Sequence, residues 1–390
     1  MNNQPSDILI CTDYLPPSGG GVEVVVEELA VSLAQSGTHI ILFSLGAGNI
    51  PSSFEHQNID VVFADPIELT ETIGLQTRIS TDAFTKFIQT MNEYQPDIIH
   101  IHNRFFFTSF VAPIITAIKN TYTVPLILTL HIGPIDGIDG LASTFARALE
   151  ATVGRILLNY ADRIIAVSNA VADHTTSLGV KKSKITVIPN GVNTGKFSPS
   201  GSNIMTTNNE RTILFVGRLV KNKGPDIFVE ALEKVFNRNN KCSACVVGEG
   251  PMEDRLRDKA KRLGIFDRIK FAGYVENMPK TMREADLFCR PSLSEGMPLT
   301  LLEAMSCGLP PVVSAVAGVP EVVTDGYSGI LIDQPTPDSV AEGLIKLLND
   351  PALANRISQN ARNHMVENYG WERRAQEVRS VYESCLSEVK

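Results

Sequence analysis

The sequence predicts an α/β protein made of two consecutive parallel-sheet domains that face a central cleft. Three observations carry this prediction. Short apolar segments alternate with helical segments along the chain, as in βαβ units. The apolar segments are rich in Ile, Val and Leu, which is typical of parallel strands covered on both faces. The alternation stops once, at a polar segment over residues 193–209 that we interpret as a linker, and then restarts.

In the first domain, residues 1–195, helical periodicity predicts helices at residues 22–35, 80–94 and 141–160, and residues 103–123 have a mixed pattern. Apolar runs predict strands at residues 7–12, 39–45, 60–64, 97–102, 124–131, 163–168 and 185–190.

In the second domain, residues 205–370, the same alternation returns, and the tail from residue 337 onward is wholly helical in pattern. Strands are expected at residues 212–217, 244–247, 269–274, 286–291, 310–315 and 328–333. Helices are expected at residues 224–237, 251–263, 278–285, 298–307 and 319–324. Ligands of such sheets bind at the carboxyl ends of the strands, so the cleft between the two domains is the expected site.

The composition restricts the class of protein. The chain has 390 residues, 43% hydrophobic and 20% charged, as in a soluble globular protein of two or three domains. This excludes an intrinsically disordered chain. The formal net charge of −8 argues against a nucleic-acid partner, because nucleic-acid binders normally carry a basic excess. No apolar run approaches the ~18 residues of a membrane-spanning helix.

We expect a cytoplasmic protein. The polar N-terminus shows no signal-peptide pattern. Six cysteines include one CxxC pair, Cys242 and Cys245, which leads into an apolar strand and has no second ligand pair nearby. The thiols are therefore expected to be structural and the compartment reducing. Residues 105–107, which are all Phe, and the segment 141–160 leave peripheral contact with the inner face of a membrane open.

Three loops at predicted strand ends are suited to an anion. Gly19, Gly20 and Gly21 open the first helix, where backbone amides can approach a ligand. The loop is not a GxGxxG fingerprint, which disfavours a nicotinamide dehydrogenase. Arg218 and Lys223 flank the loop after the first strand of the second domain, and a guanidinium with an ammonium suits a diphosphate.

The third loop, residues 294–303, is the most informative. Pro298 fits the first turn of a helix, which places Glu295 in the preceding loop and the amides of Leu299 and Thr300 at an anion seat. Glu303 lies on the same helix face as Leu299 and needs a polar partner, for which a ribose diol is suited.

Histidines also end two predicted strands. His131 closes one strand and is a candidate for function. His100 and His102 alternate on another strand, but no further ligand set accompanies them, so we expect no metal site there. The chain has no Asp-x-Asp motif, a common clamp for a metal ion and a diphosphate.

Taken in order and spacing, these segments resemble the retaining glycosyltransferases of family 4, which have the GT-B fold of two Rossmann-like parallel-sheet domains around a central cleft. The resemblance covers nearly the whole chain. It rests on the glycine loop, His131, residues 167–168, residues 188–192, residues 217–224, residues 248–251 and the pair Glu295 and Glu303.

The resemblance implies a donor site in the second domain and a C-terminal helix, residues 371–390, that packs back on the first domain. The residues that it implies as catalytic are His131 beside the donor sugar, Glu295 near the sugar and phosphate, and the diphosphate pair Arg218 and Lys223. The residues that it implies as donor-binding are Gly20, Gly21, Tyr274, Val275, Gly296, Met297, Leu299, Thr300 and Glu303.

The implied reaction is retaining transfer of a sugar from a nucleoside-diphosphate sugar, with UDP favoured over GDP, to a sugar, lipid-linked or other hydroxyl acceptor. No cofactor and no metal ion are expected. Two alternatives stay open: a sugar phosphorylase of the same fold, for which no pyridoxal-phosphate lysine is identified, and a non-catalytic nucleotide-sugar-binding subunit.

The sequence departs from the family pattern at Ile132, where many members have Asp, and at Met297 and Pro298. The segments 46–80 and 103–160 are expected to choose the acceptor. The sequence leaves the donor sugar, the acceptor and the oligomeric state open.

Overall fold

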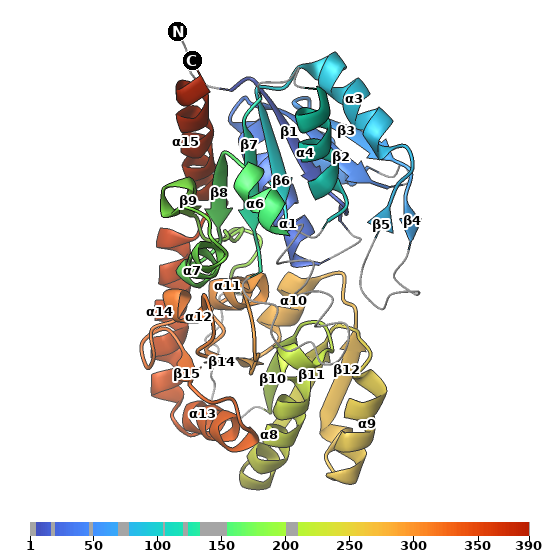
Figure 1. Ribbon diagram of the computed structural model, residues 1–390. Coiled ribbons are helices and arrows are strands. Elements are labelled where there is room, and N and C mark those ends of the chain that lie inside the picture. Colours follow the sequence, from blue (N-terminus) through green and yellow to red (C-terminus); the bar gives the residue numbers. More distant parts are fainter. Residues whose placement is uncertain are drawn as a thin grey trace. The chain divides into compact units, whose positions relative to one another are not determined.

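A computed structural model of the chain forms two compact units (Figure 1). The structure describes residues 5–16, 20–46, 50–68, 78–103, 106–119, 124–132, 154–199 and 210–389. Among these residues, unit 1 comprises the chain as far as Asn190 together with the segment from Trp371 onward. Unit 2 comprises Gly191–Gly370.

Unit 1 is built on a seven-stranded parallel sheet. Its order is β3 (Ile59–Ala64), β2 (His39–Leu45), β1 (Asp7–Thr12), β6 (Ile98–His102), β7 (Leu126–Leu130), β8 (Arg163–Ala166) and β9 (Ile185–Val187). The chain starts in the middle, winds outward through β2 and β3, and returns to β6 on the other side of β1. This reversal makes β1 and β6 the topological switch point of the sheet.

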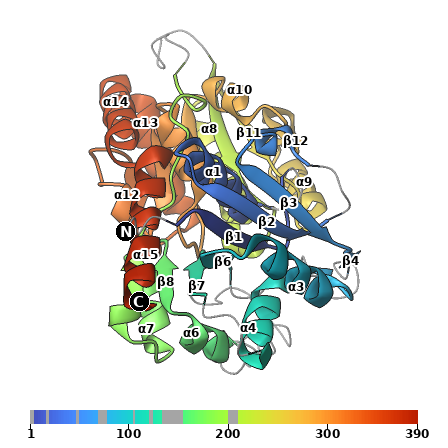
Figure 2. The same cartoon turned by 90° about the horizontal axis from the view of Figure 1, so that it is seen from above.

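Helices cover both faces of this sheet. Figure 2 shows α1 (Gly21–Gln35) on one face, and α3 (Ala83–Tyr94) and α4 (Thr108–Lys119) on the other. The strand centres are fully buried, as for Ile8, Leu9 and Ile41, because both faces are covered. The remaining elements are α6 (Arg155–Tyr160), α7 (Asn169–Ser177), a small antiparallel pair β4 (Ile67–Glu68) and β5 (Arg78–Ile79), and the 3-10 turns Ser52–Phe54 and Lys182–Lys184.

The C-terminal helix α15 (Trp371–Val389) belongs to unit 1 and packs against α1. Arg379 donates a hydrogen bond of 2.7 Å to the hydroxyl of Thr38. The hydroxyl of Tyr382, which is fully buried, lies 2.7 Å from Nδ1 of His100 on β6. Because Tyr382 is buried against β6, the last helix is a part of the core of unit 1. A neutral hydrogen bond of this kind contributes about 1 kcal/mol to stability.

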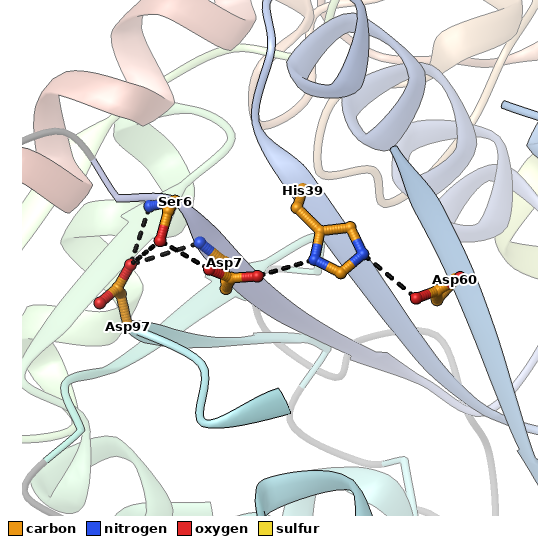
Figure 3. A network of polar contacts seen from close by, with 5 residues as sticks. All are labelled: Ser6, Asp7, His39, Asp60 and Asp97. Carbon is orange, nitrogen blue, oxygen red and sulfur yellow. Dashed lines mark hydrogen bonds and ion pairs between the residues drawn. The ribbon is translucent and has the colours of Figure 1, made fainter. Parts of the chain in front are cut away.

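A polar network joins the amino ends of the strands of unit 1 (Figure 3). His39 lies between two carboxylates, with Nδ1 2.7 Å from Asp7 and Nε2 3.2 Å from Asp60. Asp97 accepts hydrogen bonds from the backbone amide and the hydroxyl of Ser6, at 2.8 and 3.1 Å. These groups lie at the edge opposite to the carboxyl ends, where ligands bind in such sheets.

Unit 2 repeats the doubly wound plan with six parallel strands. Their order is β12 (Ile269–Gly273), β11 (Cys242–Val247), β10 (Arg211–Val216), β13 (Leu287–Arg290), β14 (Pro311–Ser314) and β15 (Ile330–Ile332). The reversal between β10 and β13 is the switch point of this sheet.

The helices of unit 2 enclose a core that includes Phe228, Leu232, Leu287 and Leu344, all fully buried. They are α8 (Pro225–Arg238), α9 (Glu253–Arg262), α10 (Met278–Arg283), α11 (Leu299–Ser306), α12 (Val319–Val322), α13 (Pro337–Asn349) and α14 (Pro351–Asn368), with 3-10 turns Lys221–Lys223 and Phe266–Arg268.

The predicted α/β class with two Rossmann-like parallel sheets is confirmed. Of the linker expected at residues 193–209, the structure describes residues 193–199, and the rest lies outside the described residues. Arg362 donates hydrogen bonds to the carbonyls of Thr194 and Phe197, and Ser306 donates to Phe197 as well, so this segment is bound to unit 2. Helix α7 and helix α4 lie where no helix was predicted. Of the predicted helix 141–160, the structure describes only α6, and residues 141–153 lie outside the described residues.

Candidate functional site

The switch point of unit 2 gathers the charged loops that follow β10 and β13. The β10 loop runs from Gly217 through Arg218 to the 3-10 turn Lys221–Lys223 and ends at Gly224, directly before α8. Strand β13 ends at Arg290, and the β13 loop runs from Pro291 to Pro298 and enters α11. Because β10 and β13 are paired neighbours, the two loops lie side by side at the carboxyl edge.

Two side chains of these loops, Lys223 and Glu295, form one largely buried ionic cluster with Arg290 at the end of β13. Nζ of Lys223 lies 2.8 Å from Oε2 of Glu295, and Nη2 of Arg290 lies 2.8 Å from Oε1 of the same carboxylate. The hydroxyl of Ser292 bridges Arg290 and Glu295, because it accepts a hydrogen bond from Nε of Arg290 at 3.2 Å and donates one to Glu295 at 2.7 Å. Arg290 also donates to the hydroxyl of Thr300. The sequence analysis placed Lys223 and Glu295 near the same ligand but not in contact with each other.

The electrostatics of the cluster keep Glu295 ionised. Burial by itself raises the pKa of this carboxyl, but the charges of Arg290 and Lys223 outweigh burial and hold the pKa below its ordinary value. The pKa of Lys223 is lowered by burial and by the nearby Arg290, while Glu295 acts in the opposite direction. A deprotonated Glu295 cannot donate a proton, so it holds the two cations in place and accepts hydrogen bonds.

Arg218 differs from Lys223 in its surroundings. Its side chain is exposed, and it forms no hydrogen bond or ion pair with the described residues. It is therefore a cation available to an anionic ligand. The two loops and the end of β13 carry four cations, Arg218, Lys221, Lys223 and Arg290, against the single carboxylate of Glu295. This excess of positive charge favours an anionic ligand at the carboxyl edge of unit 2.

Two glycines permit the close approach of these loops. Gly224 has φ +67°, and a Cβ there would lie 2.0 Å from the carbonyl oxygen of Pro291. Gly248, after β11, has φ +121°, and a Cβ there would lie 2.1 Å from the carbonyl oxygen of Gly217. Glycine is required at both positions by φ and by contact.

Helix α11 begins one residue later than predicted, with Pro298 as its N-cap and Leu299 as its first residue. The first-turn amides at Leu299 and Thr300 lack intrahelical acceptors, as in every helix, and no side chain caps this end. Met297 is 5% exposed and Gly296 is buried. Glu303 is half-buried.

Tyr274 and Val275 follow β12, at the same carboxyl edge but three strands away from β13. The Tyr274 side chain is 64% exposed, which leaves a ring face accessible. The five predicted residues between Gly296 and Glu303 and the pair after β12 therefore share one edge of unit 2. Their roles stay predictions.

In unit 1, His131 directly follows β7 and joins a chain of buried histidines. Its Nε2 lies 3.1 Å from Nδ1 of His102, at the end of β6. His100, two residues earlier on β6, lies 2.7 Å from the hydroxyls of Tyr382 and Thr129. Burial lowers the pKa of His131 to about 3 and that of His100 to about 3. All three rings are therefore neutral at pH 7.

The glycine loop of unit 1 is described in part, because Gly19 lies outside the described residues. Gly20 is the N-cap of α1, and its backbone amide donates to the carboxylate of Glu23. Gly21 is the first residue of the helix and is exposed. At Gly20 the nearest atom to an added Cβ is 3.8 Å away, so nothing among the described residues requires glycine there.

Peripheral membrane contact by residues 105–107 and 141–160 of unit 1 stays a prediction. Phe106 packs edge-on against Tyr14 at 5.9 Å between ring centroids, and Phe107 packs against Phe84 at 6.2 Å. Both rings are half-buried in unit 1. Phe105 lies outside the described residues. The segment 141–160 has two arginines, of which Arg147 lies outside the described residues and Arg155 is exposed.

The sequence analysis missed three residues of these clusters: Arg290, Ser292 and His102 as a partner of His131. Arg290 had a detectable signal, since a charge that follows the apolar residues 287–289 near the end of a predicted strand lies at the ligand edge of a parallel sheet. Nothing in the sequence indicated that His102 and His131 would meet.

The cysteines are all reduced and form no disulfide in the described part of the chain. Cys242 is fully buried and Cys245 is half-buried on β11.

No described helix combines the length and the apolar character that crossing a bilayer requires.

Two family profiles match the chain in succession. The profile described as Glycosyltransferase Family 4 matches residues 19–196, and the profile described as Glycosyl transferases group 1 matches residues 203–364. Among curated proteins, a glycosyltransferase of Methanocaldococcus jannaschii is 28% identical over 97% of this chain and 98% of its own length. The glycogen synthase of Mycobacterium tuberculosis is 26% identical over 96% of this chain and 94% of its own length.

Solved structures share the fold. The chain superposes on the sucrose-phosphate synthase of Thermosynechococcus elongatus with a TM-score of 0.82 and 21% identity, covering 98% of this chain and 100% of that one. Its TM-score to Anabaena Alr3699/HepE, crystallised in complex with UDP, is 0.78 at 22% identity, covering 97% and 100% of the two chains.

Proposed function

The chain belongs to the glycosyltransferases described by these two profiles, with the GT-B fold, and from this premise we propose that it is a retaining, metal-independent transferase of nucleoside-diphosphate sugars. Unit 2 binds the donor and unit 1 selects the acceptor. UDP-sugars are the preferred donors in this proposal, and the Anabaena protein that shares the fold is described in complex with UDP-glucose.

The observation that carries the proposal is the ionic cluster at the switch point of unit 2. Glu295 holds Lys223 and Arg290 in fixed positions before any ligand arrives. The exposed Arg218 and the uncapped start of α11 lie in the same pair of loops. A diphosphate fits this arrangement, since cationic side chains and helix amides both bind phosphate oxygens.

The chemistry follows from the charge that develops on the leaving group. Departure of a nucleoside diphosphate places additional negative charge on the β-phosphate, which Arg218 and Lys223 stabilise by about 1.5–3 kcal/mol each through charge-assisted hydrogen bonds. The start of α11 adds up to ~2 kcal/mol if the phosphate is partly buried there. The sum is comparable to the several kcal/mol that a metal ion supplies as a Lewis acid, so the protein's own groups suffice.

The remaining residues receive roles in this proposal. Glu303 binds the ribose, Tyr274 and Val275 contact the base, and His131 donates a hydrogen bond to the sugar. The ionised Glu295 acts as an anchor of Lys223 and Arg290, and not as a proton donor. The acceptor is a sugar, a lipid-linked compound or another compound with a free hydroxyl group. The transfer takes place in the cytoplasm or at the inner face of a membrane.

The test is release of nucleoside diphosphate from a panel of UDP- and GDP-sugars, with and without simple sugar acceptors. We expect release from one donor class, in the presence of chelator, with α-configured donors giving α-linked products by proton NMR. Inverted products would contradict the retaining mechanism. Absence of release from every donor, for protein shown to bind the diphosphate, would favour a binding subunit.

A further inference from the structure

The end of strand β6 and the residue after β7 meet in a pair of stacked histidine rings. The centroids of His102 and His131 lie 5.3 Å apart, with the ring planes at 23°. His102 is fully buried, and His131 is 9% exposed. The two rings share one hydrogen bond, between Nδ1 of His102 and Nε2 of His131, at 3.1 Å. Nε2 of His131 is thereby occupied, and its remaining ring nitrogen is Nδ1.

The third histidine of the group does not interact with this pair through hydrogen bonds. Both nitrogens of His100 are engaged, Nδ1 with Tyr382 and Nε2 with Thr129, each at 2.7 Å. Nε2 of His102 is buried and has no hydrogen-bond partner among the described residues. His131 is therefore the one hydrogen-bond partner of the His102 ring in the described part of the chain.

The orphan nitrogen decides where the shared proton lies. If His131 were the donor, His102 would carry its own proton on Nε2, as a buried N–H without an acceptor. If His102 donates from Nδ1, its Nε2 is a bare lone pair. Buried N–H groups without acceptors are the rarer and more costly kind of unsatisfied group. The second arrangement is therefore favoured, and it requires that neutral His131 carry its proton on Nδ1.

We propose that His102 is a positioning residue that fixes the ring and the tautomer of His131, so that His131 presents an Nδ1–H donor to the substrate. The role of His131 toward the sugar rests on the proposed function, whereas its tautomer rests on the hydrogen bond itself. A neutral donor at a fixed angle suits a sugar hydroxyl or ring oxygen, which accepts a hydrogen bond and offers no charge to pair with an imidazolium.

The first test reads the tautomer without any activity. Long-range ¹⁵N–¹H correlation spectra of protein with ¹⁵N-labelled histidine rings distinguish Nδ1–H from Nε2–H rings, and the His131→Asn variant assigns the His131 signals. We expect the Nδ1–H pattern for both His131 and His102 in the unsubstituted protein at pH 7. An Nε2–H pattern for His131 would overturn the proposal, whatever the enzyme does.

The second test uses two substitutions at one position. His102→Phe keeps a ring but removes the donor, while His102→Asn places an amide N–H near the position of Nδ1. We expect His102→Phe to lower kcat about tenfold, the value of one neutral hydrogen bond, and to give mixed His131 tautomers. His102→Asn is expected to restore most of the rate and the Nδ1–H pattern. Equal rates for both variants and the unsubstituted protein would contradict the proposal.

His100→Asn is the matched control. It changes a buried histidine of the same strand and keeps a group near Nδ1 for Tyr382, but it does not touch His131. We expect a lowered melting temperature with an unchanged His131 tautomer. Binding of UDP alone separates the proposed function from the proposed tautomer. If the unsubstituted protein binds no nucleoside diphosphate, the proposed function is refuted, while the tautomer result still stands.

Discussion

Lys223 and Glu295 are separated by 72 residues in the sequence, and their side chains form an ion pair of 2.8 Å at the carboxyl edge of the second sheet. Arg290 binds the other oxygen of the same carboxylate. The buried carboxylate of Glu295 therefore places two cations at the carboxyl ends of the neighbouring strands β10 and β13, the switch point of the sheet. The ion pairs hold these side chains in one arrangement without a ligand, and such pre-organisation reduces the ordering cost of binding.

Replacing Glu295 with Gln tests the anchor. The substitution leaves Lys223 and Arg290 buried without a counter-charge, so we expect a loss of about 3–5 kcal/mol in the free energy of unfolding, measured by urea denaturation. Lys234→Gln removes one partner of an exposed ion pair with Asp338 and is expected to cause no measurable change. Equal stability of both variants would show that the cluster carries no such energy.

Replacing Arg218 with Ala tests the exposed cation. No described residue depends on this side chain, so the melting temperature is expected to stay constant. The affinity for the nucleoside diphosphate is expected to fall about 10- to 100-fold by calorimetry, because one charge-assisted hydrogen bond is lost. An unchanged dissociation constant would remove Arg218 from the binding site.

Two glycines with the same backbone angle separate strain from contact. Gly224 and Gly264 both have φ +67°, but a Cβ at Gly224 would collide with Pro291, while nothing lies within 4 Å of one at Gly264. Gly264→Ala is expected to cost about 1–2 kcal/mol of stability, the price of the left-handed conformation. Gly224→Ala is expected to cost clearly more and to weaken diphosphate binding. Similar effects of both substitutions would contradict the close approach of the loops.

The network of Figure 3 predicts a dependence of stability on pH. Hydrogen bonds and the charges of Asp7 and Asp60 outweigh burial and raise the pKa of His39 above its ordinary 6.5. A raised pKa means that the folded state binds the proton more tightly. This contribution is present in full below pH 6.5 and is lost as the pH rises through the folded-state pKa. We expect the difference in unfolding free energy between the unsubstituted protein and His39→Gln to shrink from pH 6 to pH 9.

The buried histidines act in the opposite direction. The pKa values of His100 and His131 are lowered to about 3 by burial, so the unfolded state binds more protons below pH 6.5. Stability from this source falls as the pH drops below 6.5. The His39→Gln difference isolates one contribution, since the other is common to both proteins. A difference that grows with pH would contradict the assignment.

Metal removal tests the leaving-group chemistry. If Arg218, Lys223 and the start of α11 supply the stabilisation, turnover in excess EDTA is expected to equal turnover in magnesium. Abolition of turnover by the chelator, with recovery on adding magnesium, would point to a metal-dependent mechanism.

Much of the fold was predictable because apolar runs and helical periodicity are local properties. Strands β1 and β2 coincide with their predicted bounds, and most other strands begin or end within two residues. Helix α7 was missed because its nine residues are largely polar, and its start depends on Ser168, whose hydroxyl caps Val171. Helix α4 was missed because Pro113 interrupts its pattern.

The candidate site was predictable residue by residue but not as a set of contacts. The charges of Arg218, Lys223 and Glu295 stand out in the sequence, and their expected roles stay predictions. The pairing of Lys223 with Glu295 requires that β13 lie beside β10, which depends on strand order and not on local pattern. The same holds for His102 and His131, which meet because β6 and β7 are neighbours.

The most direct measurement is the thermal stability of the protein with UDP, GDP, ADP or NAD, each in EDTA and in magnesium. A ligand at ~100 times its dissociation constant stabilises the folded state by about 2.7 kcal/mol, a readily detected shift. The account predicts a shift with one nucleoside diphosphate, UDP first, that is the same in EDTA and is reduced in Arg218→Ala. No shift with any diphosphate, or a shift with NAD alone, would contradict it.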